Sequence, residues 1–148
     1  MTRPVRLAVR AVILHRDRLL LVNAWKEGSD LMCCPGGGVE PHQSIPDNLI
    51  REVHEETGLT VTPGPLCLVN EFHDPDGDFH QVDLYYRCEI ASGAPGADWT
   101  DPEGIVHTRR LVSRDEMAHL RVKPDSLAAV VWDGSAAAAY DPLEPLVR

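Results

Sequence analysis

The sequence predicts an α/β protein, and four stretches carry that prediction. Over residues 5–13, apolar side chains occupy every second position, which is the period of a β-strand. Over residues 44–57 they recur at four-residue steps, which is the period of an α-helix. Residues 65–72 and 80–90 return to strand-like patterns. A helix placed between strand-forming stretches favours an α/β fold.

The first element is predicted to be a β-hairpin over residues 5–25. Arg6 and Arg10 fall on the face opposite the apolar residues of its first strand. "HRDR" then turns the chain, and "LLLV", Leu19 to Val22, is a short apolar run typical of a strand that is covered on both faces.

The helix over residues 44–57 carries signals at both ends. Ser44 can cap its start, Asp47 follows three residues later as in a capping box, and Pro46 is tolerated in the first turn. Gly58 is placed to end the helix. The stripe expected to face the core consists of Ile45, Leu49 and Val53.

Downstream, the pattern predicts a second hairpin, a long loop and two short helices. They are expected at residues 65–72 and 80–90, at 91–104, and at 113–120 and 124–132. A loop as long as the one predicted is often functional in a compact domain. The C-terminal stretch "AAAAYDPLEPLVR" contains two prolines and is expected to be irregular. No repeat or linker divides the 148 residues, so we expect a single domain.

The charge balance narrows the class of partner. Fourteen Lys and Arg stand against 23 Asp and Glu, for a formal net charge of -9. That field repels polyanions, so we expect neither a nucleic-acid polymer nor an anionic membrane as a partner. The sequence contains no run of about 18 apolar residues, which is the length needed to span a bilayer. His15, Arg16 and Asp17 interrupt the N-terminal apolar stretch before a secretory signal forms.

The cysteines predict a reducing environment. They form no C-x-x-C pair and stand in apolar or strand-like surroundings, at Cys33, Cys34, Cys67 and Cys88. We expect them to be free and mostly buried, because free cysteine behaves as a small hydrophobe. A cytoplasmic location is therefore expected.

Three glutamates crowd the end of the predicted helix, in "REVHEETGL". Glu52, Glu55 and Glu56 share one helix face because they are three and four positions apart. Like charges at that spacing cost about 0.2–0.5 kcal/mol per pair, and an anion near a helix C-terminus costs up to about 1 kcal/mol more. Such a run is usually a solvated surface, but only Arg51 offsets these acids, which points to a bound cation. Mg²⁺ prefers carboxylate oxygens and keeps water and phosphate as its other ligands.

These residues, with the glycines before the helix, resemble the Nudix box, G-x5-E-x7-R-E-U-x-E-E-x-G-U, in which U is aliphatic. The stretch from Gly37 to Leu59 reads "GGVEPHQSIPDNLIREVHEETGL". The matching positions are Gly37, Arg51, Glu52, Val53, Glu55, Glu56, Gly58 and Leu59. The resemblance implies a Nudix-type α/β/α sandwich with a mixed β-sheet between helices, as one domain over residues 1–148.

One position departs from the pattern, because Gln43 stands where the family has its first glutamate. In the family that residue usually assists the metal site. Its replacement is therefore expected to weaken metal binding without abolishing it, and the nearby Glu40 could substitute in part.

The resemblance implies a hydrolase that needs Mg²⁺, or Mn²⁺, and cleaves a nucleoside diphosphate linked to another moiety. Nucleoside triphosphates, ADP-ribose and nucleotide sugars belong to this class of small-molecule substrate. Water would attack a phosphorus of the pyrophosphate, and metal would neutralise the bridging and leaving oxygens.

The resemblance also assigns roles to residues. The expected metal ligands are the Gly36 carbonyl, Glu52, Glu55 and Glu56. The expected catalytic residues are Arg51, Glu52 and Glu55, with Arg51 orienting a glutamate through a charge-assisted hydrogen bond. The general base stays open between a glutamate of the box and a later carboxylate, for which the candidates are Asp98, Asp101 and Glu103.

The substrate-binding residues stay open as well. The candidates are His73, His80, Tyr85 and Glu103. Trp25, Phe72, Phe79 and Tyr85 could stack on a base, although aromatic residues on strands more often pack the sheet. Pro75 follows Leu59 by 16 residues, the spacing associated with ADP-ribose pyrophosphatases, but "DPDGD" is also a natural turn. A calcium loop starting at Asp74 would need Gly at its sixth position and Glu at its twelfth, where this chain has Phe79 and Tyr85.

Two other functions are compatible with the sequence. A Nudix-fold nucleotide-binding or regulatory module with little turnover is suggested by Gln43, although the intact "REVHEE" argues against it. Isomerisation of an isoprenyl diphosphate is a third chemistry, whose Cys and Glu partners cannot be placed. The oligomeric state is open, with a homodimer as one arrangement.

Overall fold

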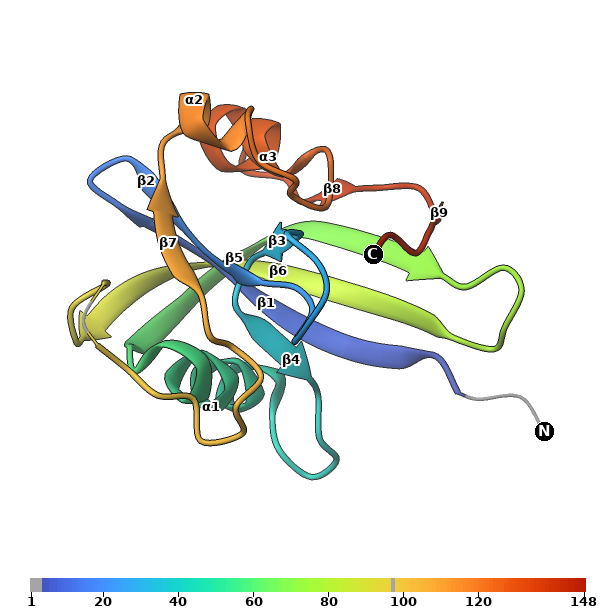
Figure 1. The fold of residues 1–148 in the computed structure, drawn as a ribbon, viewed down its shortest axis with the longest axis horizontal. Helices are drawn as coiled ribbons and strands as arrows, with labels where there is room; N and C mark the ends of the chain where they lie inside the picture. Colours follow the sequence, from blue (N-terminus) through green and yellow to red (C-terminus); the bar gives the residue numbers. More distant parts are fainter. Residues whose placement is uncertain (1–3, 97) are drawn as a thin grey trace.

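The computed structural model describes residues 4–96 and 98–148, in which nine strands and three helices form an α/β fold (Figure 1). The strands are β1 Arg6–His15, β2 Arg18–Asn23, β3 Met32–Cys33, β4 Gly36–Gly38, β5 Thr60–His73, β6 His80–Ser92, β7 Arg109–Val112, β8 Ala139–Tyr140 and β9 Glu144–Pro145. The helices are α1 Ile45–Thr57, α2 Arg114–Met117 and α3 Leu127–Asp133. Both predicted hairpins, the glutamate-bearing helix and the two short helices are confirmed.

One mixed sheet of nine strands organises the described residues, with the order β3-β2-β1-β6-β5-β8. Off this path, β4 pairs with β1, β7 with β2 and β9 with β5. β1 and β6 run parallel, with Arg10 opposite Tyr85, whereas β5 and β6 form a long antiparallel hairpin. The parallel pair brings the N-terminal strand beside a strand more than seventy residues later in the chain.

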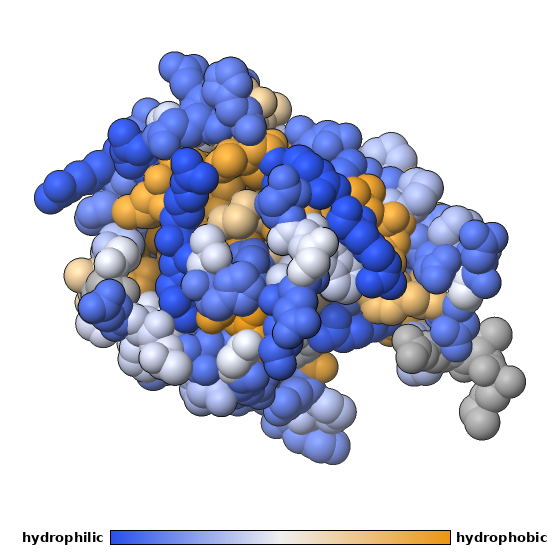
Figure 2. All heavy atoms as spheres, viewed as in Figure 1, coloured by the Kyte–Doolittle hydropathy of each residue, from blue (hydrophilic) through white to orange (hydrophobic). Residues whose placement is uncertain are grey.

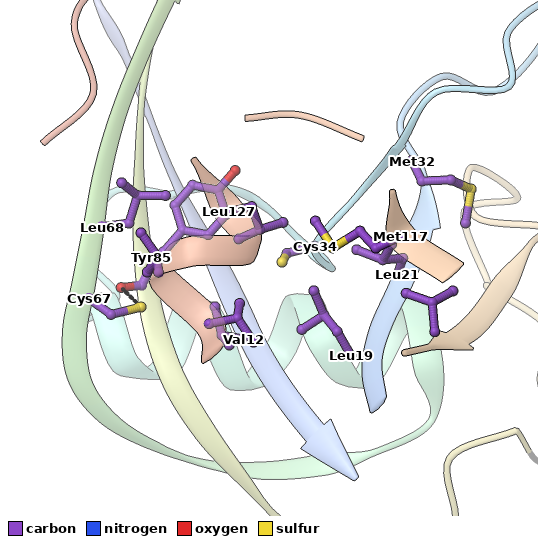
Figure 3. Close-up of a cluster of buried hydrophobic side chains, with 13 residues drawn as sticks. Val12, Leu19, Leu21, Met32, Cys34, Cys67, Leu68, Tyr85, Met117 and Leu127 are labelled. Carbon is purple, nitrogen blue, oxygen red and sulfur yellow. Dashed lines mark hydrogen bonds between the residues drawn. The ribbon is translucent and has the colours of Figure 1, made fainter. Parts of the chain in front are cut away.

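Helices cover both faces of the sheet, which confirms the α/β/α arrangement. α1 packs Leu49 and Val53 onto one face, and α2 and α3 cover the other (Figure 1). β1 is buried on both faces because of this. Its odd residues pack toward α1, and Val12 lies in the core beneath α3, where Figure 3 shows it near Tyr85 and Leu127. Ala8 and Val12 are buried, so the second face of β1 is not the polar face that the alternating pattern predicts.

α1 begins and ends as its sequence predicts. The Ser44 hydroxyl accepts a hydrogen bond from the Asp47 N–H, and Gly58 adopts φ 76° as the left-handed C-cap. Trp99 Nε1 donates to the Glu55 carbonyl at 2.8 Å and Arg109 Nε donates to the Glu56 carbonyl. These contacts satisfy carbonyls that a helix end leaves without partners, and the Arg109 cation opposes the negative end of the helix dipole.

The C-terminal stretch differs from the expectation of an irregular tail. β8 and β9 pair in parallel with β5, and the Leu146 N–H donates to the His73 carbonyl at 2.8 Å. Ser126 Oγ donates to Asp141 Oδ2 at 2.7 Å, which ties the same segment to the start of α3. Local sequence rich in alanine and proline does not reveal such pairing, because the partner strand is distant in the chain.

The remaining expectations on composition concern the cysteines and membrane spans. All four cysteines are free, and three of them are buried, as predicted. Within the described residues, no helix is both long and apolar enough to cross a bilayer. The face drawn in Figure 2 is largely polar, with apolar side chains visible between the α2–α3 layer and the strands beneath it.

Candidate functional site

The three glutamates of α1 line one cavity of about 240 Å³. The cavity lies between the C-terminal half of α1, β4, β1 and the loop that follows β6. Its other lining residues are Arg6, Arg10, Val22, Asn23, Ala24, Cys33, Gly36, Gly37, Gly38, Asp101, Glu103 and Ile105. We call it the glutamate cavity. Acidic groups and two arginines thus line a single cavity, as a site for a cation and a phosphate would require.

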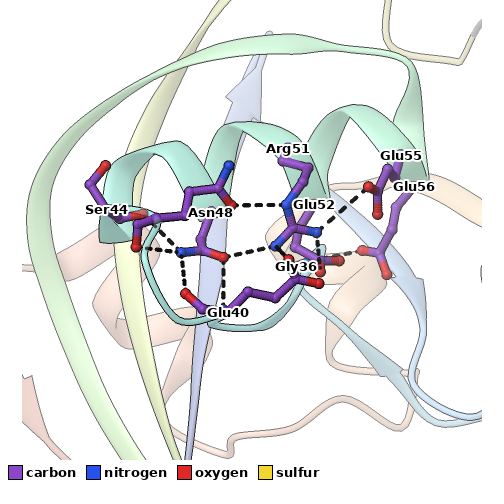
Figure 4. Close-up of polar contacts among 9 residues, drawn as sticks. Gly36, Glu40, Ser44, Asn48, Arg51, Glu52, Glu55 and Glu56 are labelled. Atoms are coloured by element: carbon purple, nitrogen blue, oxygen red, sulfur yellow. Dashed lines mark hydrogen bonds and ion pairs between the residues drawn. The ribbon is translucent and has the colours of Figure 1, made fainter.

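Arg51 holds two of the glutamates in place (Figure 4). Its NH1 donates to Glu52 Oε1 at 2.9 Å and lies 3.6 Å from Glu55 Oε1. Its NH2 donates to the side-chain oxygen of the buried Asn48 at 2.8 Å. The guanidinium therefore has a fixed orientation, and it partly offsets the repulsion between the carboxylates.

Gln43, which departs from the family pattern, lies beside Arg51 rather than in the glutamate cavity. Its Oε1 accepts a hydrogen bond from Arg51 Nε at 3.0 Å, and its backbone carbonyl accepts one from Asn48 Nδ2. Glu40 Oε2 lies 3.9 Å from Arg51 NH2. Gln43 and Glu40 therefore both contact Arg51, which in turn contacts Glu52 and Glu55.

Glu56 is the most deeply placed of the three acids. Desolvation by burial raises the pKa of its carboxyl to about 7, and the charges of Glu52 and Asp101 act in the same direction. Arg10 and a hydrogen bond of 2.8 Å from the Gly36 N–H oppose that rise. Burial also raises the pKa of Glu52, against the hydrogen bond from Arg51. Both shifts come mainly from burial, which disfavours the ionised form of each carboxyl.

Two glycines of β4 provide the room for this arrangement. A Cβ on Gly36 would lie 1.9 Å from the Val9 carbonyl oxygen of β1. A Cβ on Gly37 would lie 2.5 Å from Glu52 Oε2. The first glycine permits close strand contact, and the second leaves the space that the Glu52 carboxylate occupies.

The three loop carboxylates separate into different environments. Asp101 is 5% exposed, and its oxygens accept backbone N–H groups of Glu103, Ile105 and Val106. Glu103 lines the glutamate cavity, and no hydrogen bond or ion pair of its carboxylate occurs within the described residues. Asp98 does not line the cavity. Asp101 therefore shapes the loop, and Glu103 is the available carboxylate.

Three candidates for substrate binding lie away from the glutamate cavity. His73 and His80 stand at the far end of the β5–β6 hairpin, where His80 Nε2 lies 3.2 Å from Glu71 Oε2. Tyr85 is buried in the core on the α3 side of the sheet, where desolvation raises the pKa of its hydroxyl well above the ordinary value. Pro75 lines neither this cavity nor the second one described below.

Sequence reasoning did not single out Arg10, which the structure places at the centre of the site. Burial alone would lower the pKa of its guanidinium. The negative charge of Asp83 and a smaller contribution from Glu56 act in the opposite direction, the net pKa is raised, and Arg10 stays charged. Its NH1 donates to the Cys34 carbonyl at 3.2 Å, while its Nε is buried without a hydrogen-bond partner in the described structure. An arginine in the middle of the apolar run "LAVRAVIL" was the available signal.

Comparisons with known proteins agree with this fold. Residues 4–132 match the family model described as the NUDIX domain. A mouse protein, nucleoside diphosphate-linked moiety X motif 6, is 34% identical over 112 residues, which are 69% of this chain and 34% of that protein. The chain thus spans about a third of the length of that relative.

Solved structures show the same fold. A NUDIX hydrolase from Nitrosomonas europaea has a TM-score of 0.72 at 23% identity, with 88% of each chain covered. An ADP-ribose pyrophosphatase from Streptococcus suis has a TM-score of 0.67 at 22% identity, covering 92% of this chain and 98% of that one. At these identities the likeness concerns the fold alone.

Proposed function

The chain belongs to the NUDIX domain family, and on that premise we propose that it is a divalent-metal-dependent hydrolase. Its substrate would be a small nucleotide in which a nucleoside diphosphate is linked to another moiety. The observation that carries this proposal is the glutamate cavity, where Glu52, Glu55 and Glu56 face the same space as Arg6 and Arg10. Carboxylates suit a hard cation, and guanidinium groups suit the phosphates it would accompany.

The donor set fits Mg²⁺ or Mn²⁺ in its chemistry. Within the described residues, no three His, Cys, Asp or Glu side chains already form a metal cluster. Glu52 and Glu55 instead contact Arg51, and Glu56 accepts the Gly36 N–H. Gly37 leaves the space in which the Glu52 carboxylate lies, so the acidic groups meet in one cavity without a side chain between them.

We therefore place the metal ligands at Glu52, Glu55, Glu56 and the Gly36 carbonyl. When bound, the metal would supply charge neutralisation for the pyrophosphate oxygens. Arg51 would hold Glu52 and Glu55 in orientation from the side opposite the metal.

The protein's own groups would carry the remaining steps. Arg10 and Arg6, which both line the cavity, would bind phosphate oxygens. Glu103 is our choice of general base among the loop carboxylates, because its side chain is available and lines the cavity. It would accept the proton of the water that attacks phosphorus, and the leaving phosphate would depart past the arginines.

The test is metal-dependent turnover on a panel of substrates. Purified protein is incubated with Mg²⁺ or Mn²⁺ and dNTPs, ADP-ribose, nucleotide sugars or dinucleoside polyphosphates, and the products are identified by mass spectrometry in ¹⁸O-labelled water. We expect cleavage of at least one compound, with one ¹⁸O atom in a phosphate product, and loss of cleavage in EDTA. Nucleotide binding without turnover on the whole panel would support a binding module instead.

Gln43→Glu tests the departure from the family pattern. A new carboxylate beside Arg51 adds negative charge near the glutamate cavity, so we expect tighter Mn²⁺ binding by calorimetry. The effect should be at most about fivefold, because Gln43 is exposed and surface ion pairs contribute up to about 1 kcal/mol. His42→Glu, at the neighbouring exposed position, is the control for charge, and its thermal midpoint is measured as well because His42 has a φ of 68°. Equal affinity in Gln43→Glu and the native protein would argue against a role for position 43.

The single domain over residues 1–148, the cytoplasmic location and a homodimer stay predictions. The homodimer can be tested by sedimentation of the purified protein at micromolar concentration.

A further inference from the structure

A second cavity of about 340 Å³ lies beside β7. Its walls come from the loop before β3, from β7 and the residues before it, and from the chain that follows α2. Among the described residues, Asn23 alone lines both this cavity and the glutamate cavity. We call it the basic cavity. Its volume lies within the range of about 300–1,000 Å³ that is typical of small-molecule sites.

The basic cavity lies on the α2–α3 side of the sheet. Successive side chains of a strand point to opposite faces. Arg109 turns toward α1, where its Nε donates to the Glu56 carbonyl, whereas Arg110 lines the basic cavity. Val112, two residues after Arg110, packs in the core on the side that α2 and α3 cover (Figure 1). A ligand in the basic cavity would therefore be separated from the three glutamates by β7 and by Asn23.

Hydrogen bonds between distant segments fix the walls of the basic cavity. Asn23 Oδ1 accepts the backbone N–H groups of His107 at 3.0 Å and Thr108 at 3.1 Å. Met32 N–H donates to the Arg121 carbonyl at 2.8 Å, which joins β3 to the chain after α2. His107 Nε2 lies 2.9 Å from the Lys26 carbonyl oxygen. The cavity is therefore pre-formed by the fold, as small-molecule sites usually are.

The side chains of the basic cavity are mainly hydrogen-bond donors, although the whole chain has a net charge of -9. Arg110, Arg121, His107 and His119 line it, and Asp30 is its one acidic lining residue among the described residues. Arg121 NH1 donates to Asp30 Oδ1 at 2.6 Å, so that acid already has a counter-ion. Within the part of the chain that the structure describes, the Arg110 and His119 side chains have no hydrogen bond or ion pair. Their donors are available to a ligand.

This set of groups suits phosphate better than a cation. Guanidinium groups match the geometry and charge of phosphate oxygens, and the Thr108 hydroxyl can add a further hydrogen bond. A metal ion is a poorer occupant, because Asp30 is engaged by Arg121 and no three His, Cys, Asp or Glu side chains form a metal cluster among the described residues. A nucleic-acid polymer is a poorer occupant as well, because the overall negative field repels it.

We propose that the basic cavity binds the phosphate group of a small molecule, with Arg110 as its principal contact. Inorganic phosphate and a phosphomonoester present the same group, and Met32 and Leu120 offer apolar contact to the organic part of an ester. The proposal concerns a site outside the glutamate cavity, and it does not depend on the hydrolase activity proposed above.

An NMR titration of the full chain in EDTA tests this site, since backbone amide signals report where a probe binds. The probes are phenyl phosphate, inorganic phosphate and acetate, at constant ionic strength. We expect saturable shifts at Arg110, His119 and Arg121 with phosphate probes, and roughly tenfold weaker binding of acetate, which has fewer charges and acceptor oxygens. No saturable shift at these residues with either phosphate probe, or equal affinity for acetate, would overturn the proposal.

The two phosphate probes distinguish the sources of the group. Tighter binding of phenyl phosphate would identify a phosphomonoester, because its ring can bury apolar surface against Met32 and Leu120. Equal or tighter binding of inorganic phosphate would identify the free ion as the ligand. Either result supports the phosphate site.

Arg110→Gln tests the principal contact, and Arg16→Gln is its matched control. Arg16 is also exposed, lies in the β1–β2 turn and lines neither cavity. We expect Arg110→Gln to weaken phosphate binding roughly fivefold to tenfold, and Arg16→Gln to change it by less than about twofold. The thermal midpoint of each variant checks the fold, and His119→Gln provides a second lining change if Arg110→Gln does not fold. Equal affinity in the Arg110→Gln and Arg16→Gln variants would contradict the proposal.

The titration also separates this site from the glutamate cavity. Phosphate bound beside the glutamates would shift the amide signals of Gly36–Gly38, which line that cavity. Shifts confined to those glycines would reject the basic cavity as a phosphate site. Because the titration contains no metal and measures no turnover, failure of the hydrolase on the substrate panel would leave its result unchanged.

Discussion

Glu56→Gln is expected to reduce metal-dependent hydrolysis by roughly 10³-fold, the scale at which loss of a group that stabilises transition-state charge is felt. The amide retains the side-chain oxygen that accepts the Gly36 N–H at 2.8 Å, so the local geometry should persist. It loses the negative charge that a cation would bind. Steady-state kinetics on whichever compound of the panel is cleaved measures the change, and full activity in the variant would reject the metal-ligand assignment.

The same variant should be more stable than the native protein when metal is absent. The pKa of Glu56 is raised from 4.5 to about 7, so the folded state disfavours its ionised form. The stabilising effect of protonation is complete below pH 4.5 and is lost as pH rises through 7. At pH 8 the native protein should therefore unfold more easily than Glu56→Gln, by up to about 3 kcal/mol.

Urea unfolding in EDTA at pH 5 and pH 8 measures this difference. We expect the native protein and Glu56→Gln to be closer in stability at pH 5 than at pH 8. Asp115→Asn, at a carboxylate that is exposed and far from the cavity, is the control for removal of one charge. A gap between Glu56→Gln and the native protein that does not grow with pH would contradict the assignment of a raised pKa to Glu56.

Gly37→Ala is expected to reduce turnover by roughly 10²-fold while the fold is retained. The added methyl would lie 2.5 Å from Glu52 Oε2, so the carboxylate would have to leave its position beside Arg51. Because Gly37 has no positive φ, alanine adds no backbone strain of the left-handed kind. The measurement is kcat/KM with excess Mg²⁺, together with the thermal midpoint.

Gly77→Ala is the matched control for that change. Its Cβ would lie 2.8 Å from Asp74 Oδ2, so it also displaces a carboxylate, but in the β5–β6 turn away from both cavities. We expect native turnover in Gly77→Ala. Equal turnover in the two alanine variants would show that the position of Glu52 does not limit the reaction.

The parts of the site that the sequence predicts are those encoded locally. Ser44, Gly58 and the spacing of Glu52, Glu55 and Glu56 lie within one helix and its caps, where position in the sequence determines position in space. The family pattern then assigns metal binding to these glutamates. The same pattern could not place Gln43, whose contact with Arg51 depends on how the loop before α1 closes.

The parts that the sequence does not predict depend on contacts between distant residues. Arg10 has a buried carboxylate partner because β1 pairs in parallel with β6, so that Asp83 and Tyr85 become its neighbours. The choice between Asp101 and Glu103 depends on which loop amides fold onto which carboxylate. Spacing along the chain carries no information on either point.

The pairing of β8 and β9 with β5 also bears on aggregation. A long strand at the border of a sheet exposes N–H and C=O groups that can pair with another copy of the chain. Here Leu68, Val69, Phe72 and His73 of β5 are paired with residues of the C-terminal stretch, so part of that border is closed within the molecule. A chain that loses β8 and β9 would leave backbone N–H and C=O groups of β5 unpaired. Self-association through this edge strand would then compete with folding.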